Sequence, residues 1–179
     1  FVRRNNTELL AALGNFVNRT LTFTHKYLDG RVPQAGQRKP VDHEQLQRCR
    51  RTADTMAQLL EGFHFKAALA ELMSLARAAN GYFDATAPFR TRRTDPAACA
   101  TAINVCIQTI KALTTLMAPF LPFSARKCLR FLRLDESALA WDQATVELPA
   151  GHQLDPPEIL FRKLELADFD EPEAERPSG

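Results

Sequence analysis

The chain has 179 residues, enough for one domain with a buried core. Apolar residues make up 45% of it, which excludes wholesale disorder, and no apolar run approaches the roughly 18 residues of a membrane span. The net charge of +2 is unevenly divided. Six acidic residues and one arginine from Glu165 onward give −5, which leaves +7 for residues 1–164, and such a basic body suits a polyanionic partner.

Helical periodicity runs through most of the chain, because apolar residues recur at three- and four-residue spacings. Gly30 is expected to end the first helix and Asp42, with Gln45 three residues on, to cap the second. Pro88 should end the third, and Asp95 followed by proline should cap the fourth. The expected helices cover about residues 5–28, 42–62, 65–86, 95–118 and 123–132.

The remaining segments have the composition of loops and linkers. Residues 30–40 contain two glycines and two prolines, residues 135–160 contain several turn signals, and residues 170–179 are typical of a disordered linker. We therefore expect an all-α helical bundle over residues 1–165 and an acidic tail over residues 166–179. Trp141, the only tryptophan, is expected at the edge of the bundle in a structural role. Because the chain starts with phenylalanine and is helical from its first residues, we expect it to be a piece of a larger protein.

The cysteines and histidines do not form a metal-binding pattern. No two cysteines have CxxC spacing, and the histidines are scattered, so no metal site is expected. Cys99 and Cys106 would lie about 10.5 Å apart along a shared helix, too far for a disulfide. Free buried thiols in a reducing, cytoplasmic compartment are the expectation for all four cysteines, which are Cys49, Cys99, Cys106 and Cys128.

The first expected helix has two different faces. Its apolar arc holds Leu9, Leu10, Leu13, Phe16, Val17, Leu21, Phe23, Tyr27 and Leu28, and its polar arc holds Asn15, Asn18, Arg19, Thr22 and Lys26. Solvated helix faces usually carry glutamate and lysine, whereas asparagine is a poor helix former. Gly14 costs roughly 1 kcal/mol relative to alanine, which suggests close packing or the close approach of a partner. Asn15 and Arg19 are adjacent on the helix, and their amide and guanidinium suit base edges or phosphate, although a solvated face is the alternative.

Five segments carry a family resemblance when taken in order. They are FVRRNN, LGNFVNRTLTFTHKYLDGRVP, FKAALAELMSLARAANGYFDATAPF, LMAPFLPFSARKCLRFL and GHQLDPPEILFRKLE. From Phe1 to about Glu165 the chain resembles the anticodon-binding domain of methionyl-tRNA synthetase. The resemblance implies a helical bundle of the class I synthetase type, lying C-terminal to a catalytic domain. That domain carries HIGH-type and KMSKS-type motifs, and neither occurs here. The chain alone should therefore be inactive and bind no cofactor, whereas the parent methionine–tRNA ligase would use ATP and Mg.

The resemblance also implies an anticodon-binding site for the CAU loop of methionine tRNA. The family's N-x-x-x-R pattern, whose two residues contact anticodon bases, falls on Asn15 and Arg19. The aromatic residue on which the first anticodon base stacks falls on Phe89, after Pro88. The family usually has tryptophan there, and phenylalanine offers less area and no N–H donor. We expect Phe89 to be exposed.

Two groups of basic residues accompany these positions. The first is expected to contact the tRNA backbone and consists of Lys26, Arg31, Arg90, Arg92 and Arg93. The second lies in and directly after the short helix expected over residues 123–132, where contact with tRNA and a solvated face packing toward the catalytic domain stay equally open. It consists of Arg126, Lys127, Arg130 and Arg133.

Two alternatives to a methionyl-tRNA synthetase domain stay open. The helical anticodon domain of a leucyl, isoleucyl, valyl or cysteinyl enzyme is one, although the N-x-x-x-R pair with the Ala-Pro-aromatic segment favours the methionyl type. A helical protein-interaction module without RNA binding is the other. The expected partners are the methionine-specific tRNA and the catalytic domain of the same chain, with no membrane.

Overall fold

The structure, a computed structural model, describes the backbone of residues 5–161. The expected tail, residues 166–179, and the first segment of the resemblance up to Arg4 therefore lie outside the described residues. The described part contains helices and no strand, with one isolated antiparallel bridge between Arg31 and Gln153. The all-α prediction is confirmed.

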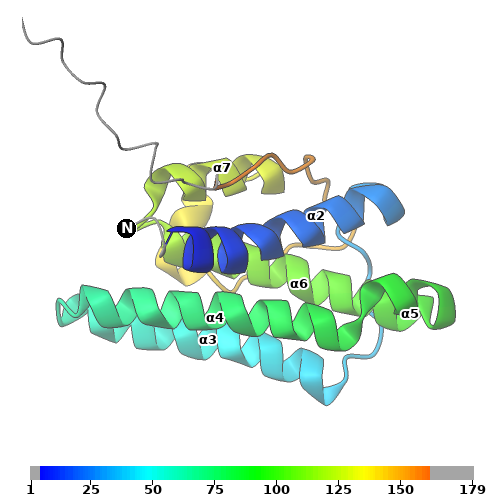
Figure 1. Ribbon diagram of the computed structural model, residues 1–179, viewed down its shortest axis with the longest axis horizontal. Coiled ribbons are helices and arrows are strands. Elements are labelled where there is room, and N and C mark those ends of the chain that lie inside the picture. The colour runs from blue at the N-terminus through cyan, green and yellow to red at the C-terminus, as the bar shows by residue number, and fades with distance from the viewer. Residues whose placement is uncertain (1–4, 162–179) are drawn as a thin grey trace, which may run out of the picture.

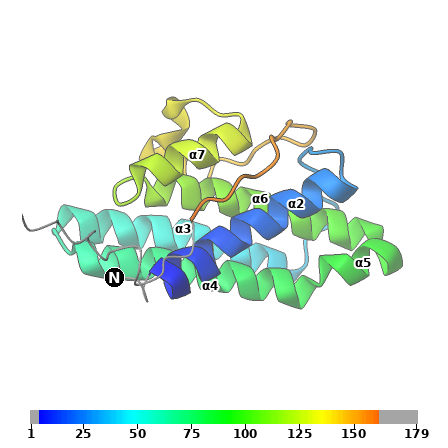
Figure 2. The same cartoon turned by 45° about the horizontal axis from the view of Figure 1, so that its top comes forward.

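Most of the elements follow one another through short connections. They are the π-helix η1 (Asn5–Gly14), the α-helices α2 (Asn15–Tyr27), α3 (Pro40–Glu61), α4 (Phe65–Thr86), α5 (Pro88–Thr94), α6 (Pro96–Met117) and α7 (Pro122–Leu132), and the 3₁₀ turns η2 (Glu136–Leu139) and η3 (Trp141–Gln143). Helices α3 and α4 form an antiparallel pair, η1 and α2 cross above α4, and α7 lies on the far side of α2 (Figure 1). The C-terminal end of α2 and the short helix α5 lie at the same end of the bundle in both views, opposite the α3–α4 turn (Figure 2).

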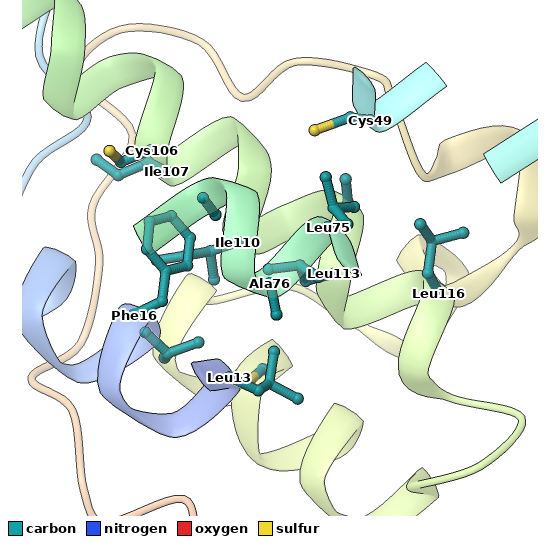
Figure 3. Packing of buried hydrophobic residues seen from close by; sticks show 14 of the residues in the cluster. Leu13, Phe16, Cys49, Leu75, Ala76, Cys106, Ile107, Ile110, Leu113 and Leu116 are labelled. Carbon is teal, nitrogen blue, oxygen red and sulfur yellow. The ribbon is translucent and has the colours of Figure 1, made fainter. Parts of the chain in front are cut away.

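Helix α6 is the centre of the core. Every residue from Thr101 to Met117 is buried, and the helix packs against α2, α3, α4, α5 and α7. Figure 3 shows Ile107, Ile110 and Leu113 of α6 among side chains from η1, α2, α3 and α4. By length and composition α6 could cross a membrane, contrary to our reading of the sequence, but 83% of that apolar window is buried in the bundle, as in the core helix of a globular domain.

The observed helix ends correct two predictions. The first helix is not continuous, because residues 5–14 form a π-helix before α2 begins. Helix α3 starts earlier than expected, at Pro40, so Asp42 is not the N-cap residue but lies in the first turn. Its carboxylate reaches back to accept the Lys39 backbone N–H at 2.7 Å. Gln45, expected to complete a capping box, is buried and donates to Thr109 at 3.4 Å.

Other local predictions are confirmed. Asp95 caps α6 by accepting the Ala98 backbone N–H at 3.0 Å. All four cysteines are free and buried. Trp141 packs against the core at the edge of the bundle, and its indole N–H donates to the Ala53 carbonyl of α3 at 3.3 Å.

Candidate nucleic-acid interface

The two faces expected for the first helix are present in α2 and in the end of η1. Leu13, Phe16, Val17, Leu21 and Phe23 are buried, whereas Asn15, Asn18, Thr22 and Lys26 are exposed and Arg19 is half-buried. The side chain of Leu10 is outside the described ones. Gly14 is closely packed, since an added Cβ would lie 3.1 Å from the ring of Phe161. Close packing was one of the two explanations offered for a glycine at this position.

The polar face of α2 lies against the C-terminal half of α4. The Asn15 amide donates to Asn80 Oδ1 at 3.4 Å, and the Arg19 guanidinium pairs with Asp84 at 2.6 Å. Asn80 itself donates to the Ala12 carbonyl at 2.7 Å, which ties α4 to the junction of η1 with α2. Asn15 and Arg19 therefore stand on a shared α2–α4 surface.

Phe89 is exposed, as predicted, with 53% of its surface accessible. Three other rings pack against it in T-shaped arrangements: Phe23 at 5.0 Å, Phe83 at 6.1 Å and Tyr27 at 6.4 Å between centroids. These contacts hold the ring, while about half of its surface stays exposed. The Arg19 guanidinium also packs over the ring of Phe83, with its Cζ 4.3 Å from the centroid of that ring. One aromatic cluster thus joins Phe89 to Arg19.

A short helix that the sequence did not predict presents Phe89. Pro88 was expected only to end α4, which stops at Thr86, but α5 begins at Pro88. Ala87 between them has φ +44°, in the left-handed region, so the chain turns sharply. Proline then suits the first position of the new helix, because its φ is already helical and it needs no backbone donor.

The basic residues around this surface differ in their surroundings. Arg90 and Arg93 of α5 are exposed, and neither forms an ion pair within the described residues. The Arg92 guanidinium instead lies over the ring of Tyr27, with Cζ 4.2 Å from the centroid, and Lys26 Nζ is 5.4 Å from the same centroid. Arg31 donates to the Gly151 carbonyl at 3.1 Å.

Comparison with known proteins decides the family. A family model described as the anticodon binding domain of methionyl tRNA ligase matches residues 32–177. The chain belongs to this family. Leucyl, isoleucyl, valyl or cysteinyl alternatives receive no support from the match.

Curated relatives and solved structures agree with it. The chain is 42% identical to the methionine–tRNA ligase of Pyrococcus abyssi over 92% of its length, and 42% identical to that of Porphyromonas gingivalis over 95%. It covers only 22% and 25% of these two proteins. The structure of apo methionyl-tRNA synthetase from Mycobacterium tuberculosis superposes with a TM-score of 0.88 at 28% identity, covering 92% of this chain and 34% of that one. The structure of that synthetase bound by methionyl-adenylate gives 0.79 at 32% identity, covering 90% and 33%.

Sequence reasoning missed three members of this anticodon-binding domain's candidate surface. Asn80 and Asp84 lie four residues apart on α4, a spacing that places them on one helix face, and Tyr27 was assigned only to the apolar arc. The Asn80–Asp84 spacing was a usable signal. The sequence contained no signal for the pairing of Asn80 and Asp84 with Asn15 and Arg19, which lie 65 residues away.

The second basic group mostly makes contacts within the domain. Arg126 pairs with Glu136 at 2.9 Å and Arg133 with Asp155 at 2.6 Å. Lys127 lies 3.2 Å from Glu158 and donates to the Ile159 carbonyl at 2.7 Å. These pairs hold the segment after α7 against that helix, and Arg130 is the exposed member of the group without an ion pair in the described part of the chain.

No group of three or more metal-ligating side chains occurs among the described residues. The thiols are in environments that suppress ionisation. Burial raises the pKa of Cys49 to about 11 and that of Cys128 to about 12, and it also raises the pKa of Cys106. The candidate surface itself offers an exposed aromatic ring for stacking, an exposed amide for hydrogen bonding and exposed cations for charge attraction.

Proposed function

We propose that this domain reads the CAU anticodon loop of methionine tRNA through Asn15, Arg19 and Phe89. One observation carries the proposal: Arg19 and Phe89, 70 positions apart in the sequence, contact the same ring, that of Phe83. A surface that combines an exposed aromatic ring, a guanidinium and an exposed amide suits single-stranded RNA, whose unstacked bases are recognised by stacking and by hydrogen bonds to their edges.

Each group has a separate task in this recognition. Phe89 stacks the first anticodon base, an interaction worth about 1–3 kcal/mol per base in comparable sites. Asn15 offers an amide that both donates and accepts, and Arg19 offers a planar fork of donors. The exposed cations Lys26, Arg90 and Arg93 attract the phosphate backbone, which positions the loop without specifying its sequence.

The ion pair of Arg19 with Asp84 is compatible with this role. The two side chains are 30% and 64% exposed. Pairs of this kind contribute only about 0–1 kcal/mol, because water screens them. The RNA therefore competes for Arg19 at little cost, while the ring of Phe83 beneath the guanidinium keeps it at the surface.

The activity of the parent protein is part of the proposal. Since the chain spans about a quarter of the length of its curated relatives, we propose that it works within a methionine–tRNA ligase that joins methionine to tRNA using ATP and Mg. Its partners are then the methionine tRNA and the catalytic domain of the same chain, in the cytoplasm. The chemistry would take place in that domain, and this one would select the tRNA.

Titration of the chain with RNA hairpins tests the proposal. A hairpin carrying CAU should bind more tightly than one with the same loop bases permuted, at moderate salt and with the parent ligase measured in parallel. Arg19→Ala should abolish the difference between the two loops. Arg130→Ala removes an exposed arginine of α7 and should leave the difference intact. Equal binding of both loops by the unaltered chain and by the parent ligase would refute anticodon reading and favour a protein-interaction module.

A further inference from the structure

Arg92 is in a different environment from its neighbours on α5. It was grouped with the phosphate-contacting residues, but its guanidinium lies on the ring of Tyr27 at 4.2 Å, and its Nε is buried without a hydrogen-bond partner. Arg90 and Arg93, by contrast, are exposed. A guanidinium over an aromatic face is attracted by the π-electrons of the ring, most strongly where water is partly excluded.

Helix α5 packs closely against α6, and aromatic and basic side chains connect it to α2. At its start, Pro88 is buried and its carbonyl accepts a hydrogen bond from the Cys99 thiol at 3.5 Å. Towards α2 the aromatic contacts are those of Phe89 with Phe23 and Tyr27. The Arg92–Tyr27 contact adds a second attachment on the same side of α5, because residues three apart share a helix face.

We propose that Arg92 is a positioning residue for anticodon recognition: its guanidinium packs on the ring of Tyr27 and holds α5 against the end of α2, so that the exposed part of the Phe89 ring remains oriented toward the RNA. The inference rests on the proposed function and adds a residue to it. A ring already fixed in its binding orientation loses less conformational entropy when a base stacks on it.

The alternative role, a phosphate contact, makes different predictions for salt dependence. Each phosphate contact to single-stranded nucleic acid adds about 0.7 to the slope of log K against log salt. Arg92→Met keeps the unbranched stem of the side chain and removes the charged guanidinium, and Arg93→Met is the matched control on the exposed face of the same helix. Binding of the CAU hairpin by fluorescence anisotropy between about 50 and 200 mM salt gives both slopes.

Arg92→Met should weaken binding about fivefold, the effect of losing one partly exposed cation–π contact, with the slope unchanged. Arg93→Met should lower the slope by about 0.7. A second hairpin lacking the first anticodon base separates the roles further, because Arg92→Met should then have no effect while that of Arg93→Met persists. Tyr27→Leu should weaken binding at least as much as Arg92→Met, because Tyr27 also contacts the ring of Phe89. Adding Arg92→Met to Tyr27→Leu should have no further effect, whereas Tyr27→Phe, which keeps the ring, should bind normally.

Two results would overturn the inference in distinguishable ways. A reduced slope for Arg92→Met, together with an effect that persists on the hairpin without the first base, would make Arg92 a phosphate contact and leave the proposed function standing. Equal binding of CAU and permuted loops by the unaltered chain and by the parent ligase would contradict both the role of Arg92 and the proposed function. Thermal unfolding checks that each variant is folded. If Arg92→Met does not fold, Arg92→Lys distinguishes the two roles. The lysine variant should bind RNA with full affinity if residue 92 contacts a phosphate, and with reduced affinity if a planar guanidinium must pack on Tyr27.

Discussion

Gly30→Ala should destabilise the domain strongly, because two separate constraints meet at this glycine. Its φ is +63°, and an added Cβ would lie 2.6 Å from Cε1 and 2.7 Å from Nδ1 of His25. A left-handed backbone costs a residue with a Cβ about 1–2 kcal/mol. The contact with His25 forces the ring to move out of a partly buried position, since real Cβ contacts are essentially never shorter than 3.0 Å.

The two costs can be separated with other glycines of the same chain. Gly151 also has a positive φ, +83°, but no heavy atom would lie within 4 Å of its added Cβ. Gly151→Ala should therefore show the backbone cost alone, about 1–2 kcal/mol. Gly81 is in α4 with equally open space, and Gly81→Ala should stabilise the domain by about 0.5–1 kcal/mol because alanine is the better helix former.

Thermal and urea unfolding of the three variants measures the differences. The backbone cost and the steric contact with His25 together should lower the free energy of unfolding of Gly30→Ala by about 3 kcal/mol. For a domain of this size, each kcal/mol lost lowers Tm by about 2–4 °C. Combining Gly30→Ala with His25→Ala should restore the part of the stability that is lost through the contact with the His25 ring. If Gly30→Ala is no less stable than Gly151→Ala, the ring of His25 moves aside freely and the steric argument is wrong.

Three further outcomes follow from particular contacts. Phe89→Ala should weaken binding of the CAU hairpin by the stacking energy of one base, about 1–3 kcal/mol, and Phe89→Trp should strengthen it, as anisotropy titration would show. Tyr82→Phe should lower the free energy of unfolding in urea by about 1–3 kcal/mol, because the buried Asp42 carboxylate loses a donor now 2.5 Å away. Burial raises the pKa of Cys49 and Cys128 above the ordinary 9.0, to about 11 and about 12, so the unfolded state releases these protons first and stability should fall as the pH rises above about 9. Iodoacetamide at pH 8 should accordingly spare the thiols of the folded domain and label them in guanidinium, with mass spectrometry as the readout.

The local features of the domain were available from the sequence because they depend on neighbouring residues. The spacing of apolar residues in α2 predicted which side is buried, since helix geometry alone relates positions three and four apart. The cap at Asp95 and the helix stop at Gly30 follow from backbone chemistry of the same short range. The exposure of Phe89 was inferred from the proline before it and the arginines after it.

The tertiary structure decided which side chains work together. Asp84 could be found as an acidic residue of α4, but its ion pair with Arg19 spans 65 positions and exists only because α2 crosses α4 there. The same holds for Arg92, which composition groups with two other arginines and packing places on Tyr27 instead. Even Pro88, a reliable end signal for α4, becomes the start of α5 because Ala87 adopts a left-handed conformation that local propensity disfavours. Periodicity and capping fix the helices one by one, whereas the partners of a charged or aromatic side chain depend on how those helices cross.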